Sequence, residues 1–222
     1  MYDDMGWSAW PAPVTAQASL MASNWMLFLA VGGVVAVLVW GLILFALLRW
    51  RRRTRDAAVL PPQFRNNLPL EIAWTAVPLV LVCILFVYTY RAEAGVEALV
   101  SDPDVTVAVN AYRWGWTFGY RGGPTIQGSF ANPPQLVLPR DRTTRIVLTS
   151  SDVNHAFWVP AFLFKRDAIP GRVTAFDLRP QTDGTYVGHC AEFCGYSHAL
   201  MGFSVRVVAP ADYARWLKGR PA

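Results

Sequence analysis

Residues that commonly bind metals are scarce in this sequence. Its 222 residues include only three histidines, three cysteines and five methionines. The chain also lacks a long Lys/Arg tract, an internal repeat and a long low-complexity segment, so we expect no nucleic-acid partner. Charged residues are few, at 16%, whereas hydrophobic residues reach 54%. A composition this apolar directs attention first to membrane spans.

Basic residues are absent from the first 22 positions. A secretory signal peptide begins with a basic region, so we do not expect one here. Pro11 and Pro13 disfavour a helix in this stretch. We therefore expect residues 1–22 to form a short, poorly ordered segment on the extracytoplasmic side.

Two uncharged stretches are long enough to cross a lipid bilayer. At about 1.5 Å per residue, residues 25–48 can span an apolar layer of about 30 Å, and residues 72–90 form a second span. Five arginines lie between positions 49 and 55. The positive-inside rule then places residues 49–71 in the cytoplasm. The sequence thus predicts a transmembrane hairpin, residues 23–91, in a bacterial-type plasma membrane, with both chain ends on the extracytoplasmic side.

From residue 92 to residue 222 the pattern changes to short alternating segments separated by turns rich in Gly, Pro and Asp. Several short strands at regular spacing are typical of a β-sandwich or barrel. The strands that we expect are 105–112, 114–120, 136–138, 145–150, 173–178, 185–188 and 203–208. Pro210 should begin a terminal helix whose apolar face carries Tyr213, Trp216 and Leu217.

The scarce metal-binding residues gather in one stretch near the C-terminus. Cys190 and Cys194 are four residues apart, His198 follows four residues later and Met201 three after that. One loop could therefore bring two thiolates, an imidazole and a thioether to one point. Soft sulfur ligands with imidazole favour copper. A zinc site fits the spacing less well, and a disulfide between the two cysteines is the remaining alternative.

Two thiolates can bridge two copper ions, each completed by a histidine and a weaker ligand. Met201 could be one weak ligand, and the backbone carbonyl of Glu192 the other. His189 is adjacent to Cys190, and neighbouring residues of a strand point to opposite faces. We therefore expect His189 to be structural. His155 alone would be ambiguous, because an isolated histidine at a strand end is more often a hydrogen-bonded core residue.

Residues 190–201 read Cys-Ala-Glu-Phe-Cys-Gly-Tyr-Ser-His-Ala-Leu-Met. This segment resembles the dinuclear copper loop of cytochrome c oxidase subunit II, C-x-E-x-C-G-x-x-H-x-x-M, at every fixed position. Residues 151–160 and 165–172 resemble the same family. The resemblance implies a two-helix transmembrane hairpin followed by an all-β, cupredoxin-like Greek-key sandwich. It also implies a pair of copper ions bound by His155, Cys190, Glu192, Cys194, His198 and Met201.

The implied function is that of the electron-input subunit of a membrane cytochrome c oxidase. Electrons from cytochrome c would reach the copper pair and pass to haem in the catalytic subunit I, where oxygen reduction and proton pumping occur. A subunit III is a further expected partner. The carboxylate of Glu192 is implied to reach a magnesium or manganese ion shared with the catalytic subunit.

Two further residues receive roles from the resemblance. Trp114 matches the tryptophan through which electrons enter, although packing in a sandwich strand would also explain it. Glu71 matches an acid at the mouth of a proton-uptake path, although an acid at a helix N-terminus is often only a favourable partner of the helix dipole.

The sequence departs from the family around Trp114, where Arg113, Gly115 and Gly119 replace a glutamine, an aromatic residue and a frequent glutamate. Residues 92–222 contain 11 acidic and 13 basic side chains. A strongly basic, soluble cytochrome c favours an acidic docking face. The expected donor is therefore a less basic cytochrome, or one tethered in a larger complex.

Other functions use the same residues. A membrane-tethered copper-binding or copper-delivery protein would need exposed, exchangeable ligands, whereas ligands divided between residue 155 and residues 190–201 indicate a preformed cage. The intact ligand set disfavours a quinol oxidase subunit. A copper-containing subunit of a nitric oxide reductase stays open, because the catalytic partner decides that chemistry.

Overall fold

The computed structural model describes residues 11–51 and 62–219. The chain divides into two compact units. One consists of Ser23–Arg91, and the other combines Met1–Ala22 with Ala92–Ala222.

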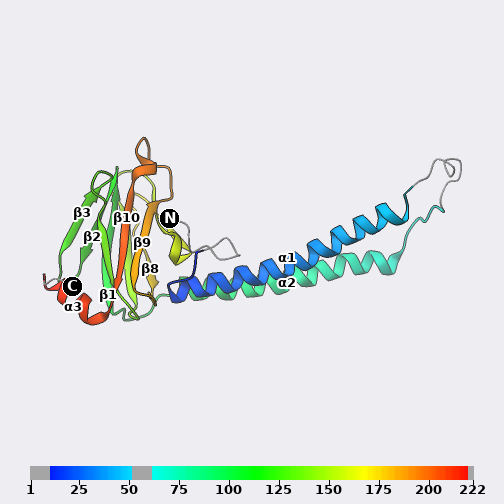
Figure 1. Cartoon of the computed structure of the whole chain (residues 1–222), viewed down its shortest axis with the longest axis horizontal. Coiled ribbons are helices and arrows are strands. Elements are labelled where there is room, and N and C mark those ends of the chain that lie inside the picture. Colours follow the sequence, from blue (N-terminus) through cyan, green and yellow to red (C-terminus); the bar gives the residue numbers. More distant parts are fainter. Residues whose placement is uncertain (1–10, 52–61, 220–222) are drawn as a thin grey trace. The chain divides into compact units, whose positions relative to one another are not determined.

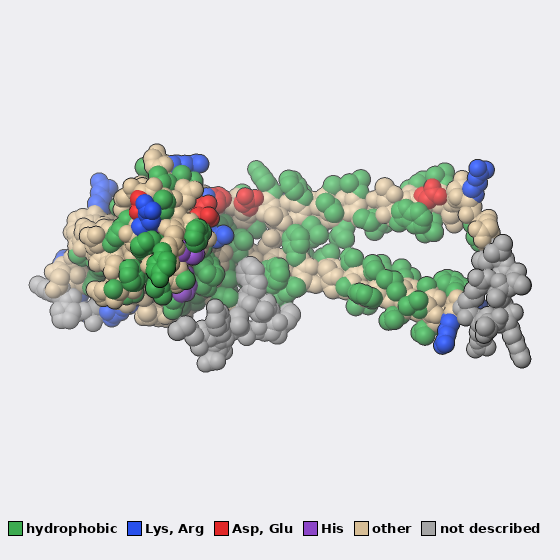
Figure 2. All heavy atoms as spheres, turned by 90° about the horizontal axis from the view of Figure 1, so that it is seen from above, with side chains coloured by type: hydrophobic (Ala, Val, Ile, Leu, Met, Phe, Trp, Pro, Cys, Tyr) green, Lys and Arg blue, Asp and Glu red, His purple; other side chains and the backbone are tan. Residues whose placement is uncertain are grey.

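Two long helices account for the first apolar part of the chain (Figure 1). They are α1 (Ala16–Arg49) and α2 (Leu68–Glu97). Their most apolar windows have mean hydropathies of 2.7 and 2.4 and are not buried within the structure. Hydrophobic side chains cover both helices in Figure 2, with the charged side chains near the helix ends. Both helices are candidate membrane spans, and each is longer than the span predicted from the sequence.

The start of α1 corrects the expectation of a poorly ordered segment up to residue 22. Thr15 is buried, and its Oγ1 accepts a hydrogen bond of 3.0 Å from the N–H of Ala18. This contact is an N-cap, which satisfies a free donor in the first turn. The helix-disfavouring prolines lie before the cap and do not interrupt the helix. The rest of the expected segment, residues 1–10, lies outside the described residues, as do residues 52–61 of the predicted cytoplasmic segment.

Among the described residues, ten strands form two five-stranded sheets. The first sheet has the order β3 (Thr125–Ser129), β2 (Gly115–Tyr120), β1 (Val105–Tyr112), β5 (Thr144–Ser150) and β8 (Thr174–Leu178). The second has the order β4 (Gln135–Pro139), β10 (Gly202–Val208), β9 (Gly184–Cys190), β6 (His155–Val159) and β7 (Phe164–Ala168). The pairs β1–β5 and β4–β10 are parallel, and the other pairs are antiparallel.

Aromatic side chains fill the space between the two sheets. Trp116 of the first sheet packs against Phe203 of the second at 5.2 Å between ring centroids, and Phe203 lies 4.8 Å from Phe157. Burial of a large apolar side chain stabilises a fold by about 1.5–3 kcal/mol. This core holds the strand ends that carry the candidate site.

The seven strands predicted from the sequence are present, with ends that differ by at most two residues. Three others, β3, β6 and β7, were not predicted. The predicted terminal helix is confirmed as α3 (Pro210–Leu217). Its Tyr213 is buried, and its Trp216 packs against Tyr120 of β2 at 4.8 Å between ring centroids.

Two short helical turns also lie among the described residues of this unit. They are η2 (Pro160–Phe162) and η3 (His198–Leu200). The segment before α1 attaches to the sandwich beside η2, because the N–H of Val14 donates to Ala161 and the carbonyl of Val14 accepts from Gln181, at 3.3 and 2.8 Å.

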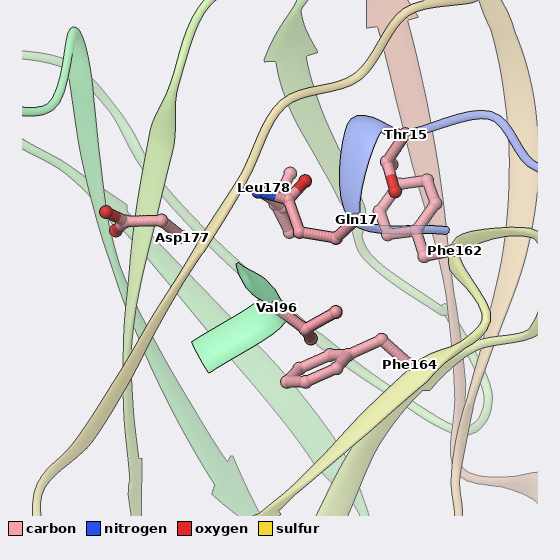
Figure 3. A pocket seen from close by; sticks show the side chains of 7 residues that line it. All are labelled: Thr15, Gln17, Val96, Phe162, Phe164, Asp177 and Leu178. Atoms are coloured by element: carbon pink, nitrogen blue, oxygen red, sulfur yellow. The ribbon is translucent and has the colours of Figure 1, made fainter. Parts of the chain in front are cut away.

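A small pocket lies beside this attachment (Figure 3). It is lined by Thr15, Gln17, Val96, Phe162, Phe164, Asp177 and Leu178. The carboxylate of Asp177 points away from the pocket, where Arg145 binds it through two contacts of 2.8 Å and the N–H of Val100 donates to it at 2.7 Å. We refer to Val100, Arg145 and Asp177 as the latch.

Candidate metal centre

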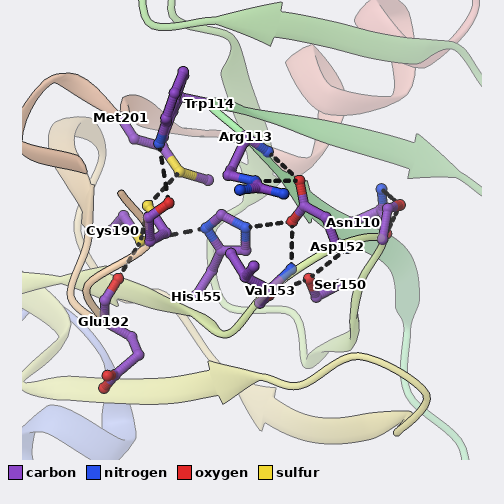
Figure 4. Close-up of polar contacts among 12 residues, drawn as sticks. Asn110, Arg113, Trp114, Ser150, Asp152, Val153, His155, Cys190, Glu192 and Met201 are labelled. Carbon is purple, nitrogen blue, oxygen red and sulfur yellow. Dashed lines mark hydrogen bonds and ion pairs between the residues drawn. The ribbon is translucent and has the colours of Figure 1, made fainter. Parts of the chain in front are cut away.

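His155 is the first residue of β6, and its side chain is fully buried. Its Nδ1 lies 3.7 Å from Sγ of Cys190. Its other ring nitrogen, Nε2, lies 2.9 Å from Oδ1 of Asp152 (Figure 4). The carboxylate therefore holds one nitrogen of the ring and leaves the other directed at the cysteine.

The loop from Cys190 to Met201 connects β9 to β10 and closes on itself. The N–H of Cys190 donates to the carbonyl of Met201 at 3.0 Å, and the N–H of Met201 donates to His198 at 3.2 Å. Gly195 has a φ of +115°, which a residue with a side chain rarely adopts. A Cβ at this position would lie 3.3 Å from the ring of Trp114. A glycine at this turn therefore allows the loop to fold back under the indole.

The loop brings together the donors that the sequence predicted. The two cysteine sulfurs lie 3.9 Å apart. Sγ of Cys194 lies 3.6 Å from Nδ1 of His198 and 3.8 Å from Sδ of Met201. On the other side, Sγ of Cys190 lies 3.3 Å from the carbonyl oxygen of Glu192. All six positions therefore belong to one connected cluster.

These separations suit metal binding. Nitrogen and sulfur donors that bind one tetrahedral ion at about 2.0–2.3 Å lie about 3.3–3.8 Å from each other. The ligand atoms of His155, Cys190 and Cys194 all lie within 4.8 Å of one another. A disulfide would bring the two sulfurs to about 2.05 Å, whereas here both cysteines are free. Two thiols, two imidazoles and a thioether form a soft donor set that suits copper.

Burial and hydrogen bonds shift the pKa values within the cluster. Burial acts to raise the pKa of Asp152, but hydrogen bonds from His155 and two backbone N–H groups outweigh it and lower the pKa to about 2. For Cys190, burial is likewise outweighed by the contact with His155, and the pKa of this thiol is lowered. Burial, together with the neighbouring Cys190, raises the pKa of Cys194. The two thiols therefore lose their protons in separate steps.

Trp114 lies directly against the loop. Its indole N–H donates to the carbonyl oxygen of Cys194 at 3.2 Å, and the side chain is half-buried. The residue that the sequence suggested for electron input is thus hydrogen-bonded to the backbone of a candidate ligand.

Two side chains beside the donor atoms, those of Glu192 and His189, lie outside the donor set. The carboxylate of Glu192 is turned away from His155 in Figure 4, and this residue is exposed. His189 pairs across the strands with Trp158, at 6.0 Å between ring centroids. Its half-buried side chain lies beside this partly exposed tryptophan, consistent with the expected structural role.

Glu71 belongs to the other unit, in the first turn of α2. Its Oε1 accepts a hydrogen bond of 2.9 Å from the N–H of Asn67, and Oδ1 of Asn67 accepts one of 3.3 Å from the N–H of Leu70. This reciprocal arrangement resembles a capping box. The hydrogen bond from Asn67 is thus a defined contact for the alternative role of Glu71, that of an acid that stabilises the N-terminus of its helix.

Sequence reasoning did not single out Asp152 as a functional residue, and it noted Arg113 only as a departure from the family. One feature of the sequence could have indicated Asp152. It is an acid three residues before the candidate ligand His155, in the turn between β5 and β6. Metal-binding histidines commonly donate their second ring nitrogen to a carboxylate, so this spacing could have suggested the contact.

The fold and the cluster define a class of protein, namely a cupredoxin-like domain with a buried Cys/His/Met centre, preceded by two candidate membrane helices. Residues 125–208 match the model of the family "Cytochrome C oxidase subunit II, periplasmic domain". The chain belongs to the cytochrome c oxidase subunit II family, and it is a subunit of the cytochrome c oxidase complex.

The relatives are similar over nearly the whole chain. A probable cytochrome c oxidase subunit 2 of Streptomyces avermitilis is 38% identical over 98% of this chain and 80% of its own length. Cytochrome c oxidase subunit 2 of Corynebacterium glutamicum is 33% identical over 95% of this chain and 75% of its own. Among solved structures, the periplasmic domain of subunit II from Bradyrhizobium japonicum is 30% identical. It covers 55% of this chain and 96% of its own, with a TM-score of 0.50.

Proposed function

We propose that this chain is the electron-input subunit of its oxidase and binds a pair of copper ions. Cys190 and Cys194 would hold the ions through their thiolates, His155 and His198 through their imidazoles, and Met201 and the Glu192 carbonyl as the weaker ligands. The observation that carries this proposal is the convergence of all six donors, with successive contacts of 3.3–3.9 Å. When bound, copper at this site would supply one-electron transfer between a cytochrome c and haem in the catalytic subunit.

The protein keeps the ligand geometry fixed. Asp152 orients the ring of His155, and the backbone bond between Cys190 and Met201 closes the ligand loop. Rigid support of this kind limits how far the ligands move when an electron arrives or leaves. Trp114, bonded to the backbone of Cys194, provides a short covalent and hydrogen-bonded route from the surface to the ligands.

Burial of the ligands favours electron transfer over copper delivery. His155 is 0% exposed, Met201 is 1% exposed, and the two cysteines are 6% and 4% exposed. A carrier that hands copper to another protein needs ligands that the recipient can reach. Four of the six donors are thus buried, whereas His198 is half-buried and Glu192 is exposed.

The proposal extends to the membrane arrangement and to the partners. We place residues 1–22 and 92–222 on the extracytoplasmic side and residues 23–91 in the transmembrane hairpin, whose connecting segment, residues 49–71, lies in the cytoplasm.

The proposed partners are the other subunits of the oxidase. Subunit I receives the electron, and subunit III completes the complex. The exposed carboxylate of Glu192 supplies one oxygen to a magnesium or manganese ion at the boundary with subunit I. Glu71 lies at the mouth of the proton-uptake path. The donor is a weakly basic or tethered cytochrome.

The test is copper loading of the full chain in detergent, with metal analysis and electron paramagnetic resonance on the same sample. We expect two coppers per chain and hyperfine structure from one electron shared by both nuclei. Cys194→Ser should abolish this signal. Cys83→Ser is the matched control, because Cys83 lies in α2 outside the cluster, and it should preserve the signal. One copper with a localised signal, or zinc in place of copper, would overturn the proposal.

A further inference from the structure

The carboxylate of Asp152 joins two segments that are distant in the sequence. Oδ1 accepts from Nε2 of His155 at 2.9 Å, and Oδ2 accepts from the backbone N–H of Arg113 at 2.7 Å. Nε of Arg113 lies 3.5 Å from the same Oδ2. The turn between β1 and β2 is therefore connected to the candidate ligand through a single side chain.

The position of this carboxylate is fixed from several sides. The N–H of Val153 donates to its Oδ1 at 2.7 Å, and Oγ of Ser150 donates to the carbonyl of Val153 at 2.5 Å. The same turn is attached to β1, because the N–H of Ser151 donates to Ala111 at 3.0 Å. Figure 4 shows Asp152 held between Arg113 and the imidazole. A displacement of Arg113 would thus shift Asp152 and, through it, the imidazole ring of His155.

Arg113 and Trp114, which are adjacent in the sequence, are linked to different members of the cluster. Arg113 acts on His155 through Asp152, whereas Trp114 bonds directly to the carbonyl of Cys194. The guanidinium is half exposed and the carboxylate less so, with side-chain exposures of 50% and 23%. A positive charge therefore lies on the solvent side of the carboxylate and partly offsets its charge.

We propose that Arg113 is a positioning residue that tunes the reduction potential of the copper centre through the contacts from Arg113 to Asp152 and from Asp152 to His155. This inference rests on the proposed copper function. Asp152 donates electron density to the ring and stabilises the oxidised centre, while the guanidinium opposes that effect. Groups that orient a ligand in this way commonly change metal affinity or activity by about 10–100-fold when they are removed.

The two charges predict shifts of opposite sign. Arg113→Gln removes the positive charge and should lower the reduction potential. Asp152→Asn removes the negative charge at nearly constant shape and should raise the potential. Arg113→Lys keeps the charge and should restore most of the shift caused by Arg113→Gln. The backbone N–H of residue 113 is present in every variant, so the Arg113 substitutions isolate the side chain.

The experiment is redox titration of the copper-loaded full chain, followed by electron paramagnetic resonance, with copper loss to a chelator as a second measurement. We expect Asp152→Asn to lose copper about 10-fold faster. Arg140→Gln is the matched control, because Arg140 forms a half-exposed ion pair with Asp183 at 2.5 Å, and it should leave the potential unchanged.

Intact shared-electron signals with equal potentials in Arg113→Gln and the wild type would overturn this inference and leave the copper proposal standing. Shifts of the same sign in Arg113→Gln and Asp152→Asn would also overturn it, because a general loosening of the site would explain them. A wild-type chain without the shared-electron signal would overturn both proposals.

Discussion

Two Asp–Arg pairs lie at opposite ends of strand β5 and are used differently. Near its first residue, Arg145 binds Asp177 of β8, whose side chain is 1% exposed. Just beyond its last residue, Asp152 contacts Arg113 and is 23% exposed. The first pair belongs to the latch and the second to the candidate metal centre.

The difference between the pairs lies in what each carboxylate oxygen accepts. Both oxygens of Asp177 are occupied by the guanidinium and the N–H of Val100. At Asp152, Oδ2 accepts a hydrogen bond from the backbone N–H of Arg113, and Oδ1 accepts from the ring of His155 and from the N–H of Val153. The same residue types therefore stabilise the fold at one end and orient a ligand at the other.

The comparison predicts the largest stability loss at the latch. Asp177→Ala would leave the partly buried guanidinium of Arg145 without its carboxylate and the N–H of Val100 without an acceptor. Breaking a buried, hydrogen-bonded pair is strongly destabilising, so we expect the unfolding temperature of the full chain to fall by about 10 °C. Asp183→Ala, which breaks the half-exposed pair with Arg140, is the control and should have little effect. Equal losses in both variants would contradict the assigned role of the latch.

A second substitution tests how tightly the metal centre is built. Gly195→Ala combines a φ of +115° with a Cβ only 3.3 Å from Trp114. Backbone strain of this kind costs about 1–3 kcal/mol, and the bond between the indole and Cys194 should weaken. Gly122→Ala is the matched control, because Gly122 has a φ of +73° and open space around the added Cβ. The fluorescence of the full chain should change for the first variant and hardly for the second.

The candidate metal centre could be predicted best where its residues are close together in the sequence. Cys190, Cys194, His198 and Met201 lie within one loop, so their spacing alone suggested a shared site. The alternating strands and α3 were also predictable, since their patterns reflect one buried face. His155 required the family resemblance, because 35 residues separate it from Cys190 and no local pattern specifies that contact.

The missed elements have physical explanations. β3 and β7 are edge strands with exposed residues, including Lys165 and Asp167 of β7, so neither shows a full apolar face. β6 is buried at every position except Trp158, so its residues do not alternate between apolar and polar. The contact between Arg113 and Asp152 spans 39 residues and depends on two turns meeting, which the sequence does not specify.

Met201→Leu separates packing from ligation. Met201 is 1% exposed, and leucine preserves most of its volume, so we expect a stability change of no more than about 1.5 kcal/mol. Loss of the thioether should nevertheless alter the resonance spectrum of the copper-loaded chain. Val205→Ala, at a position that is 0% exposed in β10, should show the reverse, with lower stability and an unchanged spectrum. An unaltered spectrum in Met201→Leu would remove this residue from the ligand set.

Tyr213, in the contact between α3 and β2, differs from the two Asp–Arg pairs because burial, and not an ion pair, shifts its pKa. Burial raises the pKa of Tyr213 to about 12 from its ordinary value of 10.0. Because the folded state retains this proton more strongly than the unfolded state, stability should be constant below pH 10 and fall above it. The loss should reach about 1 kcal/mol by pH 11. Tyr213→Phe removes the ionisable group and should flatten this part of the pH profile measured by thermal unfolding. An equally steep decline in that variant would assign the alkaline loss to other groups, such as Tyr120, whose pKa burial also raises.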